Sequence, residues 1–232
     1  PASRRSPAPR RPAGSGSAMS GRPLQNRVTP FGELIATASR GTLFGNRGGR
    51  FHKGAEELGQ RRHASRQWIC CQLAFKQRQR TVWQTGYTEL FFLDEVTAFA
   101  AGHRPCFECR RVDAERFAAS WQQAKAAARR PRAPEMDVVL DAERREGRAK
   151  RRHIAMLETL PDGAMIAEGD VALAVRGHSL LPWTPAGYLA PRPRPGCGTV
   201  VLLTPPATVA VLRAGYRPAW HESAGLSNST SS

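Results

Sequence analysis

Residues 89–111 read ELFFLDEVTAFAAGHRPCFECRR, and this stretch says more about the expected fold than any other part of the chain. Tyr87–Leu93 has the aromatic and aliphatic content of a strand. Asp94–Ala101 then reads as a short helix, with Gly102 suited to its C-cap. The CFEC element at 106–109 can present two sulfurs to one ion, because the two intervening residues close a knuckle. The stretch therefore predicts a strand, a helix and a metal-binding turn, in that order.

A second strand is predicted at Trp68–Lys76, where the residues read WICCQLAFK. Alternation along this strand places Cys71 on its apolar face and Cys70 on the other face. We therefore expect Cys71 to face the core and Cys70 to face away from it. The two predicted strands, at 68–76 and 87–93, are expected to form an antiparallel pair.

Cys71, Cys106 and Cys109 would supply three thiolates, and structural zinc prefers four sulfur or nitrogen ligands in a tetrahedron. We therefore expect zinc as the cofactor. The first choice for the fourth ligand is His52, because the Gly- and Arg-rich loop before it can fold back onto the strand ends. The alternatives for this position are Cys70, His63 and His103. Two other interpretations of the cysteines are a pair of reduced thiols beside an unrelated core cysteine, and a redox-active dithiol.

The stretch 89–111 resembles the second half of the zinc-binding module of the Ada DNA-repair protein. In that family a Phe-Phe strand, an Ala-rich helix, an Ala-Gly-aromatic-Arg-Pro segment and Cys-x-x-Cys follow in this order. The resemblance covers about a tenth of the chain and implies a zinc site in which Cys71, Cys106 and Cys109 hold the metal. The family's methyl-accepting cysteine does not carry over, because Gln67 occupies its place. The whole chain also resembles a bacterial protein family with WIxCxLxFK, YTELFFLDE and GHRPCxxCRR segments, and this resemblance implies no activity.

The chain is strongly basic, with 35 lysine and arginine residues against 19 acidic residues and a formal net charge of +16. Only four of the basic residues fall within the first eighteen positions, so the basicity belongs to the part expected to fold. Such charge predicts a polyanion partner, because Lys and Arg release counterions from phosphates without reading sequence. The alternative is that the arginine content partly reflects a GC-rich genome, since Ala, Arg, Gly and Pro are all plentiful. We expect sequence-nonspecific nucleic-acid binding through arginines near the cysteines: Arg47, Arg50, Arg61, Arg62, Arg78, Arg80 and Arg111.

Two further groups of residues have both a functional and a structural interpretation. Trp68 or Trp83 could stack on nucleic-acid bases, although core packing is the commoner fate of a tryptophan. A predicted helix carries four residues that could form an acid/base or second-metal cluster: Asp137, Asp141, Glu143 and His153. A solvated charged face, in which these residues pair with neighbouring Arg144, Arg145 and Lys150, is the favoured interpretation. The sequence identifies no catalytic residue.

The cysteine pattern and hydropathy bear on the compartment. Five cysteines, in two close pairs and one isolated position, do not form the even framework of a disulfide-stapled secreted domain. The longest apolar runs are far shorter than the roughly 18–20 residues that a membrane span needs. We expect no secretory signal, no membrane partner and a reducing, cytoplasmic location. The sequence predicts nothing about the oligomeric state.

The expected fold class is α+β, with a small zinc-stabilised α/β module followed by a β-rich module. We expect residues 1–18 to be disordered or an over-extended start, and residues 19–130 to form the Ada-like zinc module ending in a helix. Residues 131–159 are expected to be a basic helical connector. Residues 160–222 are expected to form the β-rich module, and residues 223–232 a disordered tail.

These observations predict a zinc-dependent nucleic-acid-binding protein, with a role in DNA repair or processing, in which arginines hold phosphates. Two alternatives stay open. One is a zinc hydrolase whose open fourth coordination position holds a reactive water. The other is a structural interaction protein whose zinc only supports the fold. A fourth protein ligand would favour a structural zinc, and a clustered basic surface would favour nucleic acid.

Overall fold

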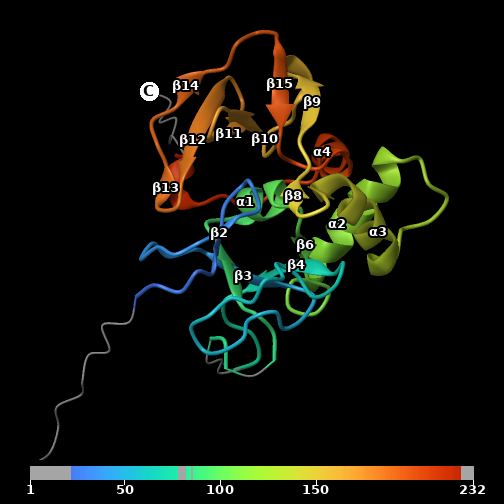
Figure 1. Ribbon diagram of the computed structural model, residues 1–232. Coiled ribbons are helices and arrows are strands. Elements are labelled where there is room, and N and C mark those ends of the chain that lie inside the picture. The colour runs from blue at the N-terminus through green and yellow to red at the C-terminus, as the bar shows by residue number, and fades with distance from the viewer. Residues whose placement is uncertain (1–21, 78–81, 85, 226–232) are drawn as a thin grey trace, which may run out of the picture.

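The computed structural model describes residues 22–77, 82–84 and 86–225, which form two large sheets and a two-stranded hairpin, with helices between and beside the large sheets (Figure 1). The predictions for residues 1–18 and for Arg78 and Arg80 lie outside the described residues. The predicted tail is wrong for Ser223 and Ala224, because Glu222–Ala224 form a short 3-10 helix, η2, whose Ala224 is buried, and residues 226–232 lie outside the described residues. The coarse α+β class is confirmed.

The N-terminal sheet has six short strands in the order β2-β1-β5-β3-β4-β6. Their bounds are Arg27–Val28 (β1), Leu34–Ile35 (β2), Leu43–Arg47 (β3), Trp68–Gln72 (β4), Leu90–Phe92 (β5) and Arg104–Pro105 (β6). β3 pairs antiparallel with both β4 and β5. The predicted direct pairing of the strands at 68–76 and 87–93 is therefore wrong, because β3, from the segment expected to be a loop, lies between them.

β3 reads LFGNR, and its central glycine explains both why it resembles a loop and why it fits between two strands. A Cβ on Gly45 would lie 2.2 Å from the Ile69 carbonyl oxygen and 2.7 Å from a ring carbon of Phe92. All five residues of β3 are buried. The missing side chain therefore lets β3 pack closely against β4 on one side and β5 on the other.

Four α-helices accompany the sheets: α1 (Glu95–Ala100), α2 (Arg111–Ala124), α3 (Ala133–Arg144) and α4 (Pro206–Arg213). α1 follows the prediction, because Asp94 caps its first turn by accepting a hydrogen bond from the Thr97 N–H at 2.8 Å. Gly102 then leaves the helix with a φ of +86°. Across residues 22–77, 82–84 and 86–225, no helix combines the length and apolar character that a membrane crossing requires.

The basic segment at 131–159 is helical only as far as Arg144, so the predicted helical connector is wrong beyond that residue. Residues 145–150 form a hairpin of β7 (Arg145–Glu146) and β8 (Ala149–Lys150). The chain turns at Gly147, which has a φ of +58° that glycine adopts without steric cost. The hairpin brings the basic side chains of this segment back toward the N-terminal sheet.

The C-terminal sheet has the order β13-β12-β11-β10-β15-β9, with β14 pairing with β12, and all its neighbouring strands are antiparallel. A 3-10 turn, η1 (Leu157–Thr159), follows β9. The strands are His153–Met156 (β9), Met165–Glu168 (β10), Val171–Arg176 (β11), Ser179–Thr184 (β12), Gly187–Tyr188 (β13), Arg192–Pro193 (β14) and Thr199–Leu202 (β15).

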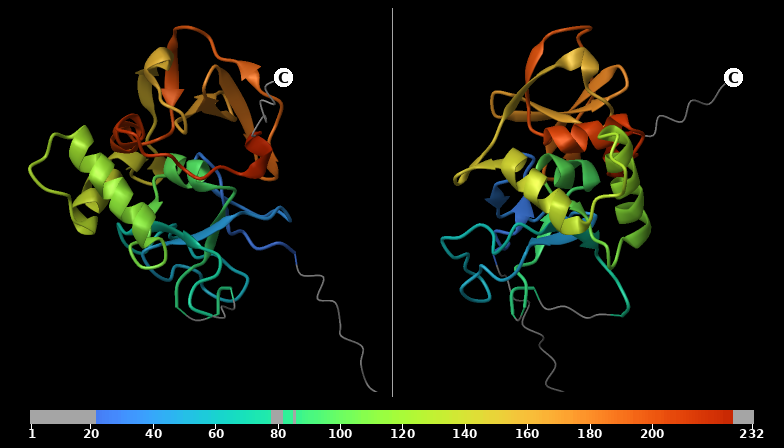
Figure 2. Two further views of the ribbon diagram at one scale, coloured as in Figure 1. Left: turned by 180° about the vertical axis from the view of Figure 1, so that it is seen from behind. Right: turned by 90° about the vertical axis from the view of Figure 1, so that its right-hand side faces the viewer.

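α1 lies between the two sheets and contributes to the cores on both sides (Figure 2). Phe99 packs in the N-terminal core, where α4 also places Val211 and Leu212. Val96 and Ala100 pack against the C-terminal sheet, where Met165 and Leu181 are buried. The two expected modules therefore share apolar cores, and a boundary near residue 130 would cut through one of them.

Candidate functional site

Three cysteine sulfurs converge at one end of the β3–β4 ladder. The Sγ atoms of Cys71, Cys106 and Cys109 lie within 4.8 Å of one another, and we call this group the cysteine cluster. Its position follows from backbone pairing, because β6 runs parallel to β4 and the Cys106 N–H donates to the Cys70 carbonyl at 3.0 Å. This pairing holds the turn at 106–109 against β4, next to Cys71.

The three thiols interact with one another. Hydrogen bonds from Cys109 and Cys71 lower the pKa of Cys106, because they stabilise its thiolate, and the same contacts raise the pKa of Cys71. The Glu108 N–H also donates to the Cys106 Sγ at 3.4 Å. All five cysteines are free of disulfides. Binding of a metal ion would release the thiol protons of the cluster, because the metal ligand is the thiolate.

The donor set suits a soft or borderline metal ion. Three thiolates of this kind are ligands for zinc and other thiophilic metals and not for magnesium or calcium, which prefer oxygen. Within the described part of the chain, no fourth His, Cys, Asp or Glu ligand atom joins the group. The apolar side chains of Phe44, Phe91 and Ile69 pack around it.

Cys70 and Cys71 point to opposite faces of β4, as alternation requires, but the prediction for Cys70 is wrong. Cys70 is fully buried in the main N-terminal core, and its Sγ accepts a hydrogen bond from Arg110 at 3.3 Å. Cys71 faces the opposite side of β4, where the cysteine cluster and its apolar neighbours lie. The alternation identified the two faces correctly, but it could not show that helices cover the Cys70 face.

The fourth ligand expected from sequence, His52, does not join the cysteine cluster. Its Nδ1 lies 2.8 Å from the Thr88 hydroxyl, and its ring stacks on Trp83 with centroids 5.7 Å apart. The physical reason is the strand direction: Cys71 pairs with Phe44 at the start of β3, whereas His52 follows the far end of that strand. The glycine-rich loop continues away from the cysteines and does not fold back to them.

The other histidine alternatives also lie outside the cluster. His103 is fully buried, and its ring centroid lies 5.0 Å from that of Trp68 and 4.6 Å from that of Phe92. Burial lowers the pKa of His103 well below its usual value, so the ring is neutral. His63 lies near Trp68, with centroids 5.8 Å apart. Both histidines belong to the other end of the β3–β4 ladder.

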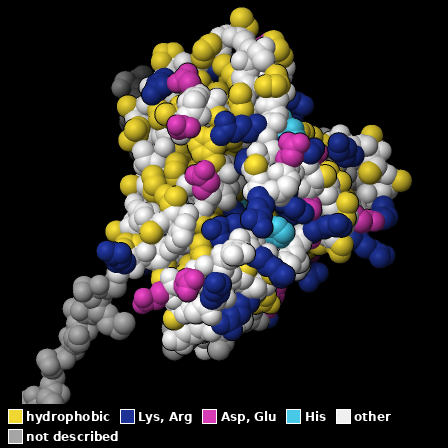
Figure 3. Space-filling view, in the orientation of Figure 1, with side chains coloured by type: hydrophobic (Ala, Val, Ile, Leu, Met, Phe, Trp, Pro, Cys, Tyr) yellow, Lys and Arg dark blue, Asp and Glu magenta, His cyan; other side chains and the backbone are white. Residues whose placement is uncertain are grey.

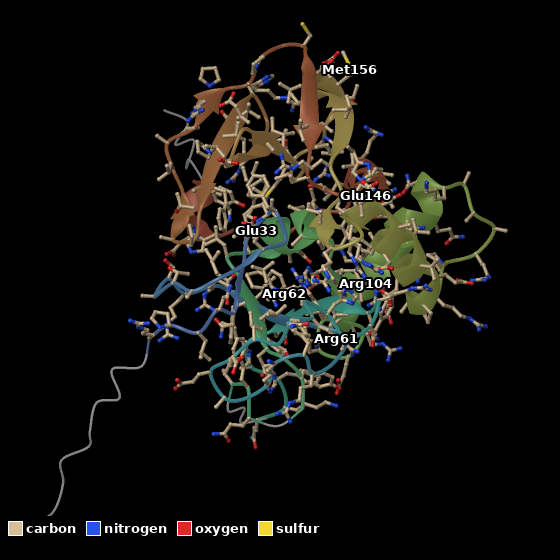
Figure 4. The ribbon with its side chains drawn as sticks, in the orientation of Figure 1. Glu33, Arg61, Arg62, Arg104, Glu146 and Met156 are labelled. Carbon is tan, nitrogen blue, oxygen red and sulfur yellow. The ribbon has the colours of Figure 1, made fainter. Side chains whose placement is uncertain are left out.

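A cavity of about 860 Å³ opens at that other end, between the β2 region, the loop at 60–64 and the β7–β8 hairpin. Eight lysine and arginine residues line it against one carboxylate, Glu33, and we call it the basic cavity. Figure 3 shows Lys and Arg side chains gathered across the middle of this face. Figure 4 labels Glu33 close to α1 and Arg62 close to β3, both in that region.

Trp68 and two buried arginines form the inner wall of the basic cavity. The guanidinium carbons of Arg47 and Arg144 each lie 4.0 Å from the centre of the Trp68 ring. Both arginine side chains are almost fully buried. Burial, with the charges of neighbouring arginines, lowers the pKa of Arg47 to about 9. Trp68 is only 6% exposed, so it packs against cations and does not present a face for stacking bases.

Arg144 is fixed by a close approach to the end of α1. A Cβ on Gly102 would lie 2.5 Å from the Arg144 Cβ, so only glycine leaves room for the arginine side chain. Arg144 donates to the carbonyls of Gly102 at 3.1 Å and Arg66 at 2.7 Å. Burial lowers its pKa to about 10. The glycine of the GHRP segment therefore positions a residue of the basic cavity.

Lys150, from β8, adds a further partly buried cation to the cavity. Its Nζ donates to the Ala100 carbonyl at 2.5 Å. Burial and the charges of Arg47 and Arg144 lower the pKa of Lys150 to about 7. The sequence analysis missed Arg144, Arg148 and Lys150 as members of one site, although the run RREGRAKRRH marks the segment that supplies them.

The arginines expected to bind nucleic acid are divided by the structure. Arg47, Arg61 and Arg62 line the basic cavity. Arg50 is exposed but does not line it, and Arg111 pairs with Glu115 at 2.8 Å at the start of α2. Arg78 and Arg80 lie outside the described residues. Three of the seven predicted arginines are therefore brought together.

The carboxylates of the basic segment have structural partners. Asp137 binds the buried Arg104 guanidinium through two hydrogen bonds, both 2.8 Å long. Asp141 accepts hydrogen bonds from Arg144 and Arg145. Glu143 accepts the Ala207 N–H at 2.7 Å, at the start of α4. Asp141 thus pairs with Arg144 and Arg145 as the structural interpretation expected, but Asp137 and Asp141 are buried and do not form a solvated face.

Comparisons of this chain with protein-family models, with curated proteins and with solved structures found no match. The geometry of the cysteine cluster and of the basic cavity is therefore the basis for any function.

Proposed function

We propose that this protein is a zinc-containing nucleic-acid-binding protein, in which zinc in the cysteine cluster holds the N-terminal sheet and the basic cavity holds phosphate. The observation that carries the proposal is the concentration of eight basic residues against one carboxylate around a single hollow. Such a cluster attracts polyanions by releasing their counterions. The resemblance of residues 89–111 to the Ada zinc module supports the metal part of the proposal.

Zinc is assigned a structural role in this proposal. Thiolate-rich zinc sites are mostly structural, whereas a catalytic zinc needs an open path to substrate. Neither the basic cavity nor the smaller apolar cavity beside β9 and α4 is lined by a cysteine. One feature favours the hydrolase alternative: three ligands converge, and within the described residues no fourth one fills the remaining coordination position. A hydrolase would lose substrate turnover on metal removal while still binding substrate, which separates the two functions.

The test of nucleic-acid binding is a salt titration with labelled single-stranded and duplex DNA and RNA. We expect little sequence preference and a log–log slope of roughly −3 to −6, at about 0.7–0.9 per neutralised phosphate. The combined variant Arg61→Ala, Arg62→Ala, Arg148→Ala should flatten this slope. Its control removes the same charge from exposed arginines outside the cavity: Arg116→Ala, Arg129→Ala, Arg192→Ala. Equal slopes for the parent and both variants would contradict the proposal.

A further inference from the structure

We propose that the basic cavity binds a terminal phosphate group, carried either by a free nucleotide or by the end of a nucleic-acid strand. The second of these sources rests on the nucleic-acid function proposed above, whereas the phosphate site itself does not. The proposal distinguishes this cavity from a surface that contacts the internal phosphates of any strand.

Positive charge inside the basic cavity is left unbalanced. Arg47 is 1% exposed, and within the described part of the chain its guanidinium has no carboxylate partner. It donates instead to the Gly32 carbonyl at 2.8 Å, to the Arg62 carbonyl at 3.4 Å and to the His103 Nε2 at 3.4 Å. A buried cation held only by neutral groups gains the most from an incoming anion, because burial has already removed its water.

Asp141, which pairs with the cavity residues Arg144 and Arg145, is shared among several cations. It accepts hydrogen bonds from Arg144 at 2.9 Å and Arg145 at 2.6 Å, and Arg66 lies 3.5 Å from it. One negative charge is thus shared among three positive charges, so the cavity stays cationic. A phosphate monoester carries close to two negative charges at neutral pH, more than an internal phosphodiester does, and offsets this excess better.

The basic cavity also has a size and shape that suit a nucleotide or a strand end. A volume of about 860 Å³ lies within the range of roughly 300–1,000 Å³ found for small-molecule pockets and is large enough for a nucleotide. The walls come from the β2 region, from the loop at 60–64 and from the β7–β8 hairpin. A continuous duplex cannot enter a hollow enclosed on several sides, whereas a strand end or a mononucleotide can.

Two cations of the basic cavity are held in place before any ligand binds. Trp68 and the Gly102 and Arg66 carbonyls hold the guanidinium of Arg144, and the Ala100 carbonyl holds the Lys150 ammonium. These cations therefore lose little conformational freedom when an anion binds, which lowers the entropic cost of binding. Long, exposed surface lysines do not have this advantage.

The experiment compares short oligonucleotides of one sequence that carry a 5′-phosphate, a 3′-phosphate or only hydroxyl ends, with AMP as competitor. We expect at least one phosphorylated end to bind about tenfold more tightly than the hydroxyl-ended strand, and AMP to compete. Lys150→Met should reduce this preference. Lys125→Met, the same change on an exposed residue at the end of α2, should not. Arg148→Ala, at an exposed hairpin position, should also reduce the preference and cannot disturb the core.

The outcomes separate this inference from the proposed function. Salt-dependent binding of all strands with no preference for a phosphorylated end, and no competition by AMP, would overturn the inference and leave nucleic-acid binding intact. AMP binding that Lys150→Met abolishes, without strand binding, would support the phosphate site with a free nucleotide as its source and overturn the proposed function. Equal preference in Lys150→Met, Arg148→Ala and the parent would place the phosphate elsewhere and overturn the inference.

Discussion

Arg47 lies directly opposite Trp68 in the β3–β4 ladder, three residue pairs along from the pair of Phe44 with Cys71. Three residues of strand span about 10 Å, so the basic cavity and the cysteine cluster occupy the two ends of one short ladder. The candidate metal site and the proposed phosphate site are thus connected by a continuous hydrogen-bonded element. A structural change at the cysteine cluster is therefore expected to alter ligand binding at the basic cavity.

Metal content is the first prediction. Purified protein should carry about one zinc per chain, and Cys106→Ser should lose the zinc together with thermal stability, because ligation energy is folding energy in such a site. Elemental analysis and thermal melting measure both effects. Cys197→Ser, which changes an exposed cysteine outside the cluster, should alter neither. A metal-free protein whose melting curve matches that of the zinc-loaded protein would contradict the assignment.

Coupling along the ladder gives the second prediction. Removing the metal with a chelator should weaken the binding of a phosphorylated strand end severalfold, although no cavity residue is a metal ligand. The reason is that Cys71 anchors the strand whose first residue, Trp68, supports Arg47 and Arg144. Fluorescence anisotropy with and without added zinc measures the change. Affinity that is unaffected in a protein shown to be metal-free would mean that β4 keeps its place without the metal.

Cys70 and Cys71 should respond differently to substitution. Cys71→Ala should abolish metal binding, because its Sγ is one of the three that converge. Cys70→Ala should keep the metal but lower the free energy of unfolding by about 1–2 kcal/mol, since it leaves a small void in the core and removes the contact with Arg110. Metal analysis and urea denaturation of the two variants test this. Loss of metal from Cys70→Ala alone would reverse the assignment of the strand faces.

The Arg104–Asp137 pair offers a test of stability. Arg104→Met alone should lower the free energy of unfolding by about 3–5 kcal/mol, because it leaves the buried Asp137 carboxylate without its partner. The double variant Arg104→Met, Asp137→Leu should recover much of this loss, since neither charge then remains buried. Arg129→Met, which breaks the exposed pair with Glu135, is the control and should change stability little. A double variant less stable than the single one would count against this account.

Lys150 makes the phosphate affinity depend on pH. Its pKa is lowered to about 7 from the usual 10.5, so the free protein loses this positive charge as the pH rises through 7. The affinity for a phosphorylated strand end should therefore fall between pH 7 and pH 9, a window above the second ionisation of phosphate near 6. Arg47 and Arg144, the charges that face Lys150, keep their protons through most of this window. Lys150→Arg should flatten the profile.

The same shift has a consequence for stability with the opposite sign. Between about pH 7 and 10.5 the unfolded chain binds more protons at Lys150 than the folded chain does, so the free energy of unfolding of the ligand-free protein should rise with pH across this window. Lys150→Met should remove this contribution. A fall in stability through the same window, in the parent but not in the variant, would mean that Lys150 is not desolvated.

Local signals predicted what lies close together in the sequence. Asp94 and Gly102 bracket α1 as expected, and the Cys-x-x-Cys spacing together with strand alternation brought Cys71 to Cys106 and Cys109. The predictions that were wrong depend on contacts between segments that are distant in the sequence. β3 was missed because Gly45 lowers its strand signal, and its role as a central strand depends on two neighbours that sequence alone does not place.

The basic cavity could not be predicted from the sequence for the same reason. Its residues come from β3, from the loop at 60–64 and from the hairpin after α3, separated by up to about a hundred positions in the chain. Composition predicted the charge, but no local pattern indicated that Arg47 and Arg144 would meet on one tryptophan. His52 was misplaced for a related reason, since a loop's direction is set by the tertiary contacts of its ends.

The pair of Arg104 with Asp137 also limits how the protein can be divided. A fragment ending at residue 130 would keep all three cysteines of the cluster, yet it would lack the carboxylate for a guanidinium that is 1% exposed. The same cut would remove Arg144 from Trp68 and expose the apolar face that α4 covers. We therefore expect the shortest piece that keeps both the cysteine cluster and the basic cavity intact to extend through α3 and α4, so deletion mapping of either site should begin from the ends of the chain and not from its middle.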